Sequence, residues 1–148
     1  MSSNQKQFSE LWAIREDVAL ASSMNVLSAF PYDVTLAQKY QNELIEKLRD
    51  KYGSEDLKVM GFGHIGDGNL HIVIQCFTEK QKARVGKEID PFLFEFISEK
   101  RGSVSAEHGV GHSKMNYLGL SKSEESLRLM VEWLNHRKAW RICLTLRQ

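Results

Sequence analysis

Hydrophobic residues follow two different periods along this chain of 148 residues. A spacing of three or four residues is typical of an amphipathic helix, whereas strict alternation with polar residues is typical of a half-buried strand. The first half of the chain therefore predicts, in order, helix Lys6–Ser22, strand Phe30–Thr35, helix Leu36–Tyr52, and strands Leu57–His64 and Leu70–Phe77. Because Pro31 cannot donate a hydrogen bond to a neighbouring strand, we expect the first strand at a sheet edge.

A third helix is expected after the second hairpin strand. Thr78 and Gln81 have the spacing of a capping box, which opens a helix by satisfying its first backbone N–H groups. Gly102 ends the helical pattern. Pro91 lies inside it and Asp90 is placed as a new N-cap, so the pattern predicts a kink or two short helices.

Two more elements complete the pattern. Ser103–Ala106 predicts a short strand, and a second capping box at Ser121–Glu124 opens a last helix that ends near Asn135. We expect this last helix to turn four apolar side chains inward, namely Leu127, Met130, Val131 and Leu134.

From Tyr32 to Glu107 the expected order is β-α-β-β-α-β, which is that of the ferredoxin-like split unit. The predicted fold class is therefore α+β, an antiparallel sheet with helices on one face and flanking N- and C-terminal helices. The length and a hydrophobic content of 42% fit a single domain over residues 1–148. In this topology the loop after Ala106 reaches the same end of the sheet as the turn at Gly66–Asn69.

Composition narrows the classes of function. A formal net charge of +1 argues against a nucleic acid or a membrane surface as partner. No apolar run approaches the roughly 20 residues of a membrane span, and the N-terminus resembles neither a signal nor a transit peptide. Cys76 and Cys143 form no C-x-x-C motif, which favours a reducing compartment. We therefore expect a soluble intracellular protein.

The predicted hairpin carries the densest candidate chemistry. Gly61–Gly66 fits the dinucleotide motif G-x-G-x-x-G, but that motif requires a following helix, and a turn and a β-branched strand follow here. We therefore reject a nucleotide site. His64 and His71 lie on one sheet face if they oppose each other, about 5 Å apart at Cβ, and can then share one metal ion. Asp67 is a competing ligand, although a turn-forming role is favoured.

Glu107 supplies a third ligand if the topology is correct. His64, His71 and Glu107 then form a two-histidine, one-carboxylate set whose open position suits catalytic Zn²⁺, and also Mn²⁺ or Fe²⁺. His108 beside this set is free to accept a proton near neutral pH. Judged from residue types alone, the reading of these histidines as ordinary core or surface groups is favoured over a metal site.

Two cations have open roles. Arg15 falls inside the apolar stripe of the first helix, where it forms either a structural ion pair or a contact to a ligand carboxylate. Lys114 either binds an anion or is a solvated loop charge. His112 and His136 are interpreted as surface residues.

Three segments resemble a known family. Gly63–His71 (Gly-His-Ile-Gly-Asp-Gly-Asn-Leu-His) and Ser103–Gly111 (Ser-Val-Ser-Ala-Glu-His-Gly-Val-Gly) resemble the two signatures of the FAD-linked oxidase C-terminal domain. That domain is the substrate side of the D-2-hydroxyglutarate and D-lactate dehydrogenases and of the glycolate oxidase flavin subunit. Leu11–Glu16 resembles the family's helix with a substrate arginine, and the likeness extends from about Phe8 to Val131.

The resemblance implies a role for each candidate residue. His64, His71 and Glu107 would bind a divalent metal that chelates a small 2-hydroxyacid, His108 would take the hydroxyl proton, and Arg15 would hold a carboxylate. Hydride would then pass to FAD, which in this family belongs to a separate N-terminal domain. This chain would therefore be a fragment that depends on a flavin-binding chain or domain, is inactive alone, and is mitochondrial if its parent is a eukaryotic member.

The chain also departs from the family. Ala19, Pro31 and Val73 stand where the family often has threonine, lysine and asparagine, so substrate contacts are thinned while the metal set is intact. The family's proline-containing C-terminal run is missing, since Pro31 and Pro91 are the two prolines here. Two alternatives stay open. One is a non-catalytic interaction protein with an actin-related partner, as some eukaryotic members are catalogued, and the other is a free-standing metallohydrolase.

Overall fold

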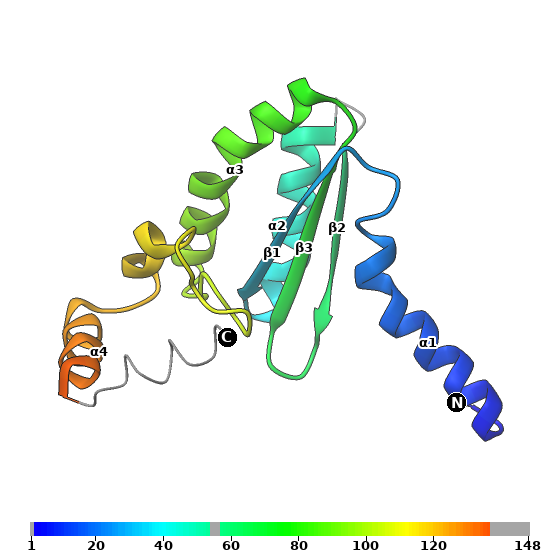
Figure 1. Cartoon of the computed structure of the whole chain (residues 1–148), viewed down its shortest axis with the longest axis horizontal. Coiled ribbons are helices and arrows are strands. Elements are labelled where there is room, and N and C mark those ends of the chain that lie inside the picture. The colour runs from blue at the N-terminus through cyan, green and yellow to red at the C-terminus, as the bar shows by residue number, and fades with distance from the viewer. Residues whose placement is uncertain (1, 54–56, 137–148) are drawn as a thin grey trace.

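A computed structural model describes residues 2–53 and 57–136, with side chains as far as residue 133. Its centre is a three-stranded antiparallel sheet of β1 (Ser28–Thr35), β2 (Lys58–His64) and β3 (Asn69–Cys76), in the order β1-β3-β2 (Figure 1). β3, the strand with the longest run of buried residues, occupies the middle. Pro31 lies on β1 at an edge, as its missing N–H group predicts.

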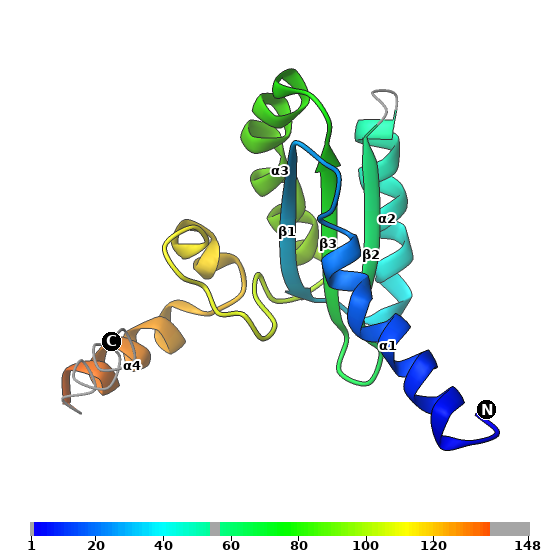
Figure 2. The same cartoon turned by 45° about the vertical axis from the view of Figure 1, so that its right-hand side comes forward.

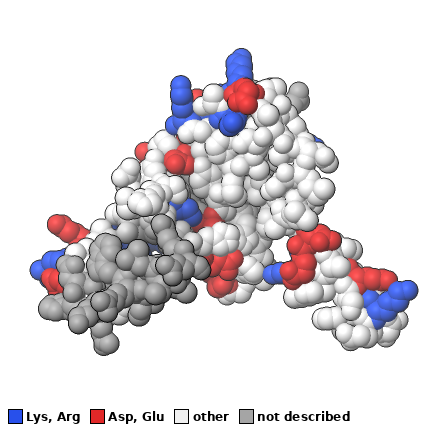
Figure 3. All heavy atoms as spheres, in the orientation of Figure 1, with Lys and Arg blue, Asp and Glu red and all other residues white. Residues whose placement is uncertain are grey.

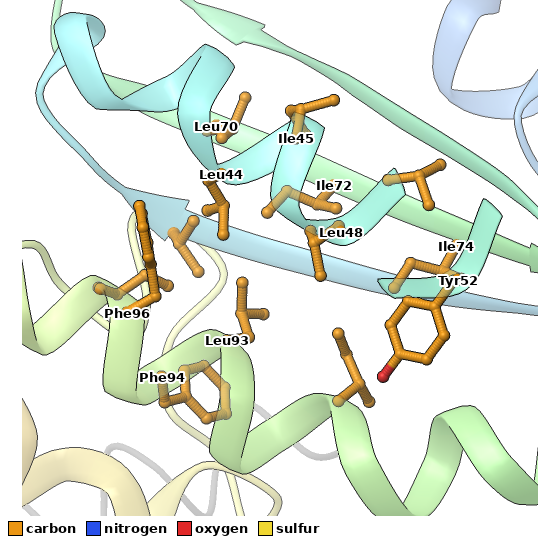
Figure 4. Packing of buried hydrophobic residues seen from close by; sticks show 14 of the residues in the cluster. Leu44, Ile45, Leu48, Tyr52, Leu70, Ile72, Ile74, Leu93, Phe94 and Phe96 are labelled. Carbon is orange, nitrogen blue, oxygen red and sulfur yellow. The ribbon is translucent and has the colours of Figure 1, made fainter. Parts of the chain in front are cut away.

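Two helices cover one face of the sheet, which confirms the predicted fold class. They are α2 (Gln38–Tyr52) and α3 (Glu79–Glu99). Leu44 and Leu48 of α2, Ile72 and Ile74 of β3, and Leu93 of α3 are buried against one another (Figure 4). Burial of such side chains stabilises the fold by roughly 1.5–3 kcal/mol each.

α3 runs as one helix through Pro91, so of the two expected outcomes, a kink or two short helices, the second is wrong. The capping box of Thr78 and Gln81 is present at its start. Asp90 begins no helix; its carboxylate accepts a hydrogen bond of 2.5 Å from the Tyr32 hydroxyl. Fully buried residues on both sides of the proline pack on the sheet, and this packing outweighs the roughly 3 kcal/mol that a proline costs inside a helix.

The predicted strand Ser103–Ala106 is reduced to a single antiparallel bridge between Ser103 and Thr35. Ser103 thus pairs with the free edge of β1, on the side away from β3, where the split topology places a fourth strand. The chain does not continue as a strand, because the N–H group of Val104 donates to the hydroxyl of Ser121. The N–H groups of Ala106, Glu107 and His108 then donate to the side chain of Asp33.

The flanking helices are present, but their apolar stripes are not buried. In α1 (Gln5–Ala21) no residue is buried, and Phe8, Leu11 and Trp12 are about half exposed. In α4 (Glu124–His136) Met130 and Val131 are exposed, so their predicted inward position is wrong, while the side chain of Leu134 lies outside the described part. Figures 1 and 2 show α4 apart from the sheet, which explains the exposure.

α1 approaches the sheet from the face opposite to α2 and α3 (Figure 2). The amide of Gln75 on β3 donates a 2.7 Å hydrogen bond to the carbonyl of Ser22, just after α1. A 3-10 helix, η2 (Met115–Leu120), contacts α3. Acidic and basic side chains are interspersed on the face in Figure 3, in keeping with the net charge of +1. Among the described helices, none has the length and apolar character that crossing a bilayer requires.

Candidate metal centre

The β2–β3 hairpin places His64 and His71 on the sheet face that α2 and α3 leave uncovered. His64 pairs with Asn69 and His71 with Phe62, so the two histidines are diagonal neighbours rather than directly opposed. Their rings nevertheless lie 5.4 Å apart, edge to face. The shared face was predicted, but the direct opposition was not correct.

The local sequence explains this tight hairpin. A Cβ atom on Gly63 would overlap the carbonyl oxygen of Asn69, so the position beside His64 requires glycine. Gly68 has a φ of +77°, a conformation that glycine adopts without strain. The carboxylate of Asp67 accepts a 3.0 Å hydrogen bond from the Asn69 N–H group. This is the favoured turn-forming role of Asp67.

Asp33 of β1 holds the loop that carries Glu107 and His108. Its Oδ2 accepts hydrogen bonds from the backbone N–H groups of Ala106, Glu107 and His108, at 3.0, 3.0 and 2.9 Å. The Ser105 hydroxyl donates a fourth, at 3.2 Å. Burial alone would raise the pKa of Asp33, but these hydrogen bonds and the nearby His108 lower it overall. The carboxylate is therefore held as an anion under the loop.

Three imidazoles converge on one oxygen of Glu107. The distances from Glu107 Oε1 are 3.1 Å to His71 Nε2, 3.5 Å to His64 Nε2 and 3.6 Å to His108 Nε2. His108 stacks on His71 with ring centroids 5.3 Å apart. The structure thus brings together the three predicted ligands and the predicted proton acceptor.

This donor set fits a divalent metal ion. Ligand atoms of Asp33, His71, Glu107 and His108 all lie within 4.8 Å of one another, and His64 joins the group through Glu107. Imidazole nitrogens with carboxylate oxygens suit Zn²⁺, Fe²⁺ and Mn²⁺. Asp33 Oδ1 is buried and accepts no hydrogen bond from the described residues, so this carboxylate oxygen has lone pairs available for a further contact.

A cavity of about 400 Å³ opens beside this cluster, between the sheet and α1. Its wall combines polar and apolar groups, namely Arg15, Glu16, Val18, Ala19, Phe62, Gly63, His64, His71 and Glu107. Arg15 is not on a buried face: its side chain is 52% exposed and forms a 2.8 Å ion pair with Glu16. Its guanidinium also lies 5.2 Å from the centre of the Trp12 ring. Arg15 is therefore available to a ligand in the cavity.

Lys114 lies elsewhere. Its Nζ donates a 3.1 Å hydrogen bond to the backbone carbonyl of Asp33, and it lines a smaller cavity of about 240 Å³ with Tyr32 and Asp90. Burial lowers the pKa of Lys114, partly offset by Asp33 and Asp90. The structure does not bring Lys114 to the cavity of Arg15. His112 is exposed as expected, and the side chain of His136 lies outside the described part.

Asp33 is the site residue that sequence reasoning missed. The sequence pattern includes it only as one member of the predicted strand Phe30–Thr35. Aspartate is depleted in strands, and Asp33 alternates with Tyr32 and Val34, which face the helices. An acidic residue on the other face of a strand was therefore an available signal, but its contact to His71 depended on the register between β1 and β3.

Comparison with known proteins gives a consistent result. A family model described as FAD linked oxidases, C-terminal domain, matches residues 1–133. The chain is 38% identical over 132 residues to the mitochondrial D-2-hydroxyglutarate dehydrogenase of Rattus norvegicus, covering 89% of this chain and 24% of that protein. The corresponding Arabidopsis thaliana enzyme is 40% identical over 126 residues, covering 84% and 22%.

A third relative is named for a different activity. The D-2-hydroxyglutarate–pyruvate transhydrogenase of Saccharomyces cerevisiae is 30% identical over 147 residues, covering 92% of this chain and 29% of that protein. The chain thus spans about a quarter of the length of these relatives.

Proposed function

This chain belongs to the family of FAD-linked oxidase C-terminal domains, and from that premise we propose that it is the substrate- and metal-binding part of a flavin-dependent D-2-hydroxyacid dehydrogenase. The observation that carries the proposal is the convergence of three imidazoles on Glu107 Oε1, beside a cavity that His64, His71 and Glu107 line together with Arg15. Neither feature alone specifies a hydroxyacid; together they provide a cation site and a carboxylate-binding group.

His64, His71 and Glu107 would hold the metal, with Zn²⁺ favoured and Mn²⁺ or Fe²⁺ as alternatives. When bound, a divalent metal would polarise the 2-hydroxyl group of the substrate and lower its pKa. His71 is the most enclosed of the three, because its side chain is 15% exposed, against 38% for His64 and 49% for Glu107. It therefore lies at the innermost part of the site. His64 and Glu107 are more open and face the cavity.

Arg15 and His108 act on the organic part of the substrate. The guanidinium of Arg15 can bind a carboxylate through two parallel hydrogen bonds if it exchanges its contact with Glu16. His108 is exposed beside the metal set and would accept the hydroxyl proton. Phe62, Val18 and Ala19 offer an apolar wall to the substrate carbon chain.

The hydride acceptor would be FAD held by another domain or chain, as the family description implies. The rat and Arabidopsis relatives are named as mitochondrial enzymes, and we propose the same compartment for the protein that carries this chain. We also expect the isolated chain neither to bind FAD nor to reduce a dye with D-2-hydroxyacids. Flavin absorbance of the purified chain, with and without added FAD, is the measurement that checks this.

The test of the metal set is calorimetric titration of the purified chain with Zn²⁺. Wild type should bind one ion, and His71→Ala should lose that affinity by at least about tenfold. His112→Ala is the matched control, because this exposed histidine is in the same loop as Glu107. Equal binding by wild type and His71→Ala would contradict the assignment. D-2-hydroxyglutarate and D-lactate are then titrated into the zinc-loaded chain to identify the substrate class.

The alternative of an interaction protein is favoured by one observation, the exposed apolar side chains Phe8, Leu11 and Trp12 of α1. None of the three relatives described above is named for an actin partner. We propose that this surface contacts the flavin-binding part of the parent protein. Binding of Zn²⁺ without any hydroxyacid binding would favour the non-catalytic alternative.

A further inference from the structure

We propose that Asp33 is a positioning residue that keeps the proton of His71 on Nδ1, and thereby presents the Nε2 lone pair of His71 to the metal beside Glu107. This inference rests on the proposed function, because it assigns a role within the same site. It is separate from the ligand assignment, since it concerns a residue that contacts no substrate.

The register between β1 and β3 places Asp33 directly opposite His71. The two residues are direct partners in the β1–β3 ladder and share the face opposite to α2 and α3. Asp33 is 2% exposed, and its Oδ1 lies 3.8 Å from His71 Nδ1. The same oxygen has no hydrogen-bond partner among the described residues. At 3.8 Å the carboxylate acts through its charge, which favours a hydrogen rather than a lone pair on the facing nitrogen.

The opposite nitrogen of His71 faces the metal site. Its Nε2 lies 3.1 Å from Glu107 Oε1, whereas its Nδ1 faces Asp33. A neutral imidazole carries its proton on one nitrogen, so a proton on Nδ1 leaves Nε2 as the donor. Carboxylates that accept the second N–H group of a metal-bound histidine fix both its tautomer and its orientation.

The second oxygen of Asp33 ties the loop to the same point. Oδ2 accepts from the backbone N–H groups of Ala106, Glu107 and His108. The carboxylate of Asp33 therefore contacts both His71 in the sheet and the backbone of Glu107 in the loop, and fixes their positions relative to each other. This explains how residues 36 positions apart, His71 and Glu107, come to lie 3.1 Å from each other.

The two oxygens make a separable test possible. Asp33→Asn has almost the same shape, and its carbonyl oxygen can still accept the loop N–H groups. Its NH₂ group then faces His71 Nδ1. Because an NH₂ group can only donate, a hydrogen bond to it requires a lone pair on Nδ1, and the proton of His71 moves to Nε2. Asp33→Ala removes both contacts. Asp67→Asn is the matched control, because Asp67 also accepts a backbone N–H group but lies in the exposed turn.

The tautomer of His71 is measured in the metal-free chain by long-range ¹H–¹⁵N NMR, at a pH where the ring is neutral. Wild type and Asp67→Asn should carry the proton on Nδ1, and Asp33→Asn on Nε2. In Zn²⁺ titrations Asp33→Asn should bind roughly 10–100-fold more weakly than wild type, with Asp67→Asn unchanged. Amide exchange of Ala106–His108 should stay slow in Asp33→Asn and become fast in Asp33→Ala, which separates positioning from loop support.

A wild-type His71 protonated on Nε2 would overturn the inference, and this reading does not depend on whether any variant folds. An Asp33→Asn protein that keeps the Nδ1 proton and wild-type zinc affinity would overturn it as well. If wild type binds no Zn²⁺, the proposed metal site fails, while the tautomer measurement still decides the role of Asp33.

Discussion

The two faces of the sheet use the same strands for different purposes. On β3, Ile72 and Ile74 point to the helix-covered face and are fully buried, whereas the intervening residues His71 and Val73 point to the face near α1. The first face packs apolar side chains, and the second collects imidazoles and carboxylates around a cavity. Strand alternation therefore separates the residues that stabilise the fold from those that carry the chemistry.

The largest expected effect lies on the covered face. Ile72→Ala should lower the free energy of unfolding by roughly 2–5 kcal/mol, because it leaves a cavity among Leu44, Leu48 and Leu93. His71→Ala, one residue away on the other face, should change stability by less than about 1 kcal/mol and instead abolish tight zinc binding. Urea unfolding of both variants checks this; equal losses of stability would break the separation between the faces.

An intermediate effect is expected at the cavity. Arg15→Lys keeps the charge but loses the planar guanidinium, so it should weaken 2-hydroxyacid binding to the zinc-loaded chain about tenfold, or roughly 1.4 kcal/mol. Because Arg15 is 52% exposed, the melting temperature should not change. Calorimetry and thermal melts measure the two quantities. A lowered melting temperature with unchanged hydroxyacid binding would show that Arg15 is structural.

The smallest effect concerns a polar atom on the covered face. The hydroxyl of Tyr52 is buried without a hydrogen-bond partner among the described residues, so Tyr52→Phe should be neutral or slightly stabilising at neutral pH. Burial raises the pKa of Tyr52 from 10.0 to about 12. Since the unfolded state deprotonates first, wild type should lose stability as the pH rises from 10.0 towards 12.

Unfolding titrations of wild type and Tyr52→Phe across this pH range measure the effect. The variant should lose less stability than wild type, because it lacks the titrating group. Identical pH dependence in the two proteins would mean that the hydroxyl of Tyr52 is solvated in the folded state.

Much of the covered face could be predicted from the sequence, because its signals are local. The alternation of Leu70, Ile72 and Ile74 indicated a strand, and Pro31 indicated an edge. The exposure of Phe8 and Met130 could not be predicted, because an apolar stripe does not reveal what covers it. The sequence left open whether the helix would run through Pro91 or stop there, because the outcome depends on packing between α3 and the sheet.

For the candidate site, the sequence predicted that His64, His71 and Glu107 lie together, but it did not reveal the residue that supports them. His64 and His71 are close in sequence and joined by a tight turn, so their shared face followed from hairpin geometry. Asp33 is distant in sequence from both His71 and the loop of Glu107, and its contacts with them depend on the register of β1 against β3. Long-range register is not encoded in any short segment, so this contact required the structure.

The most direct test of the central claim is the position of a bound metal. Crystals of the chain soaked with Zn²⁺ should give an anomalous peak at the zinc absorption edge, between His64, His71 and Glu107 on the uncovered face. A strong peak that excludes His71 and Glu107, or no peak at a Zn²⁺ concentration that saturates the calorimetric titration, would contradict the account.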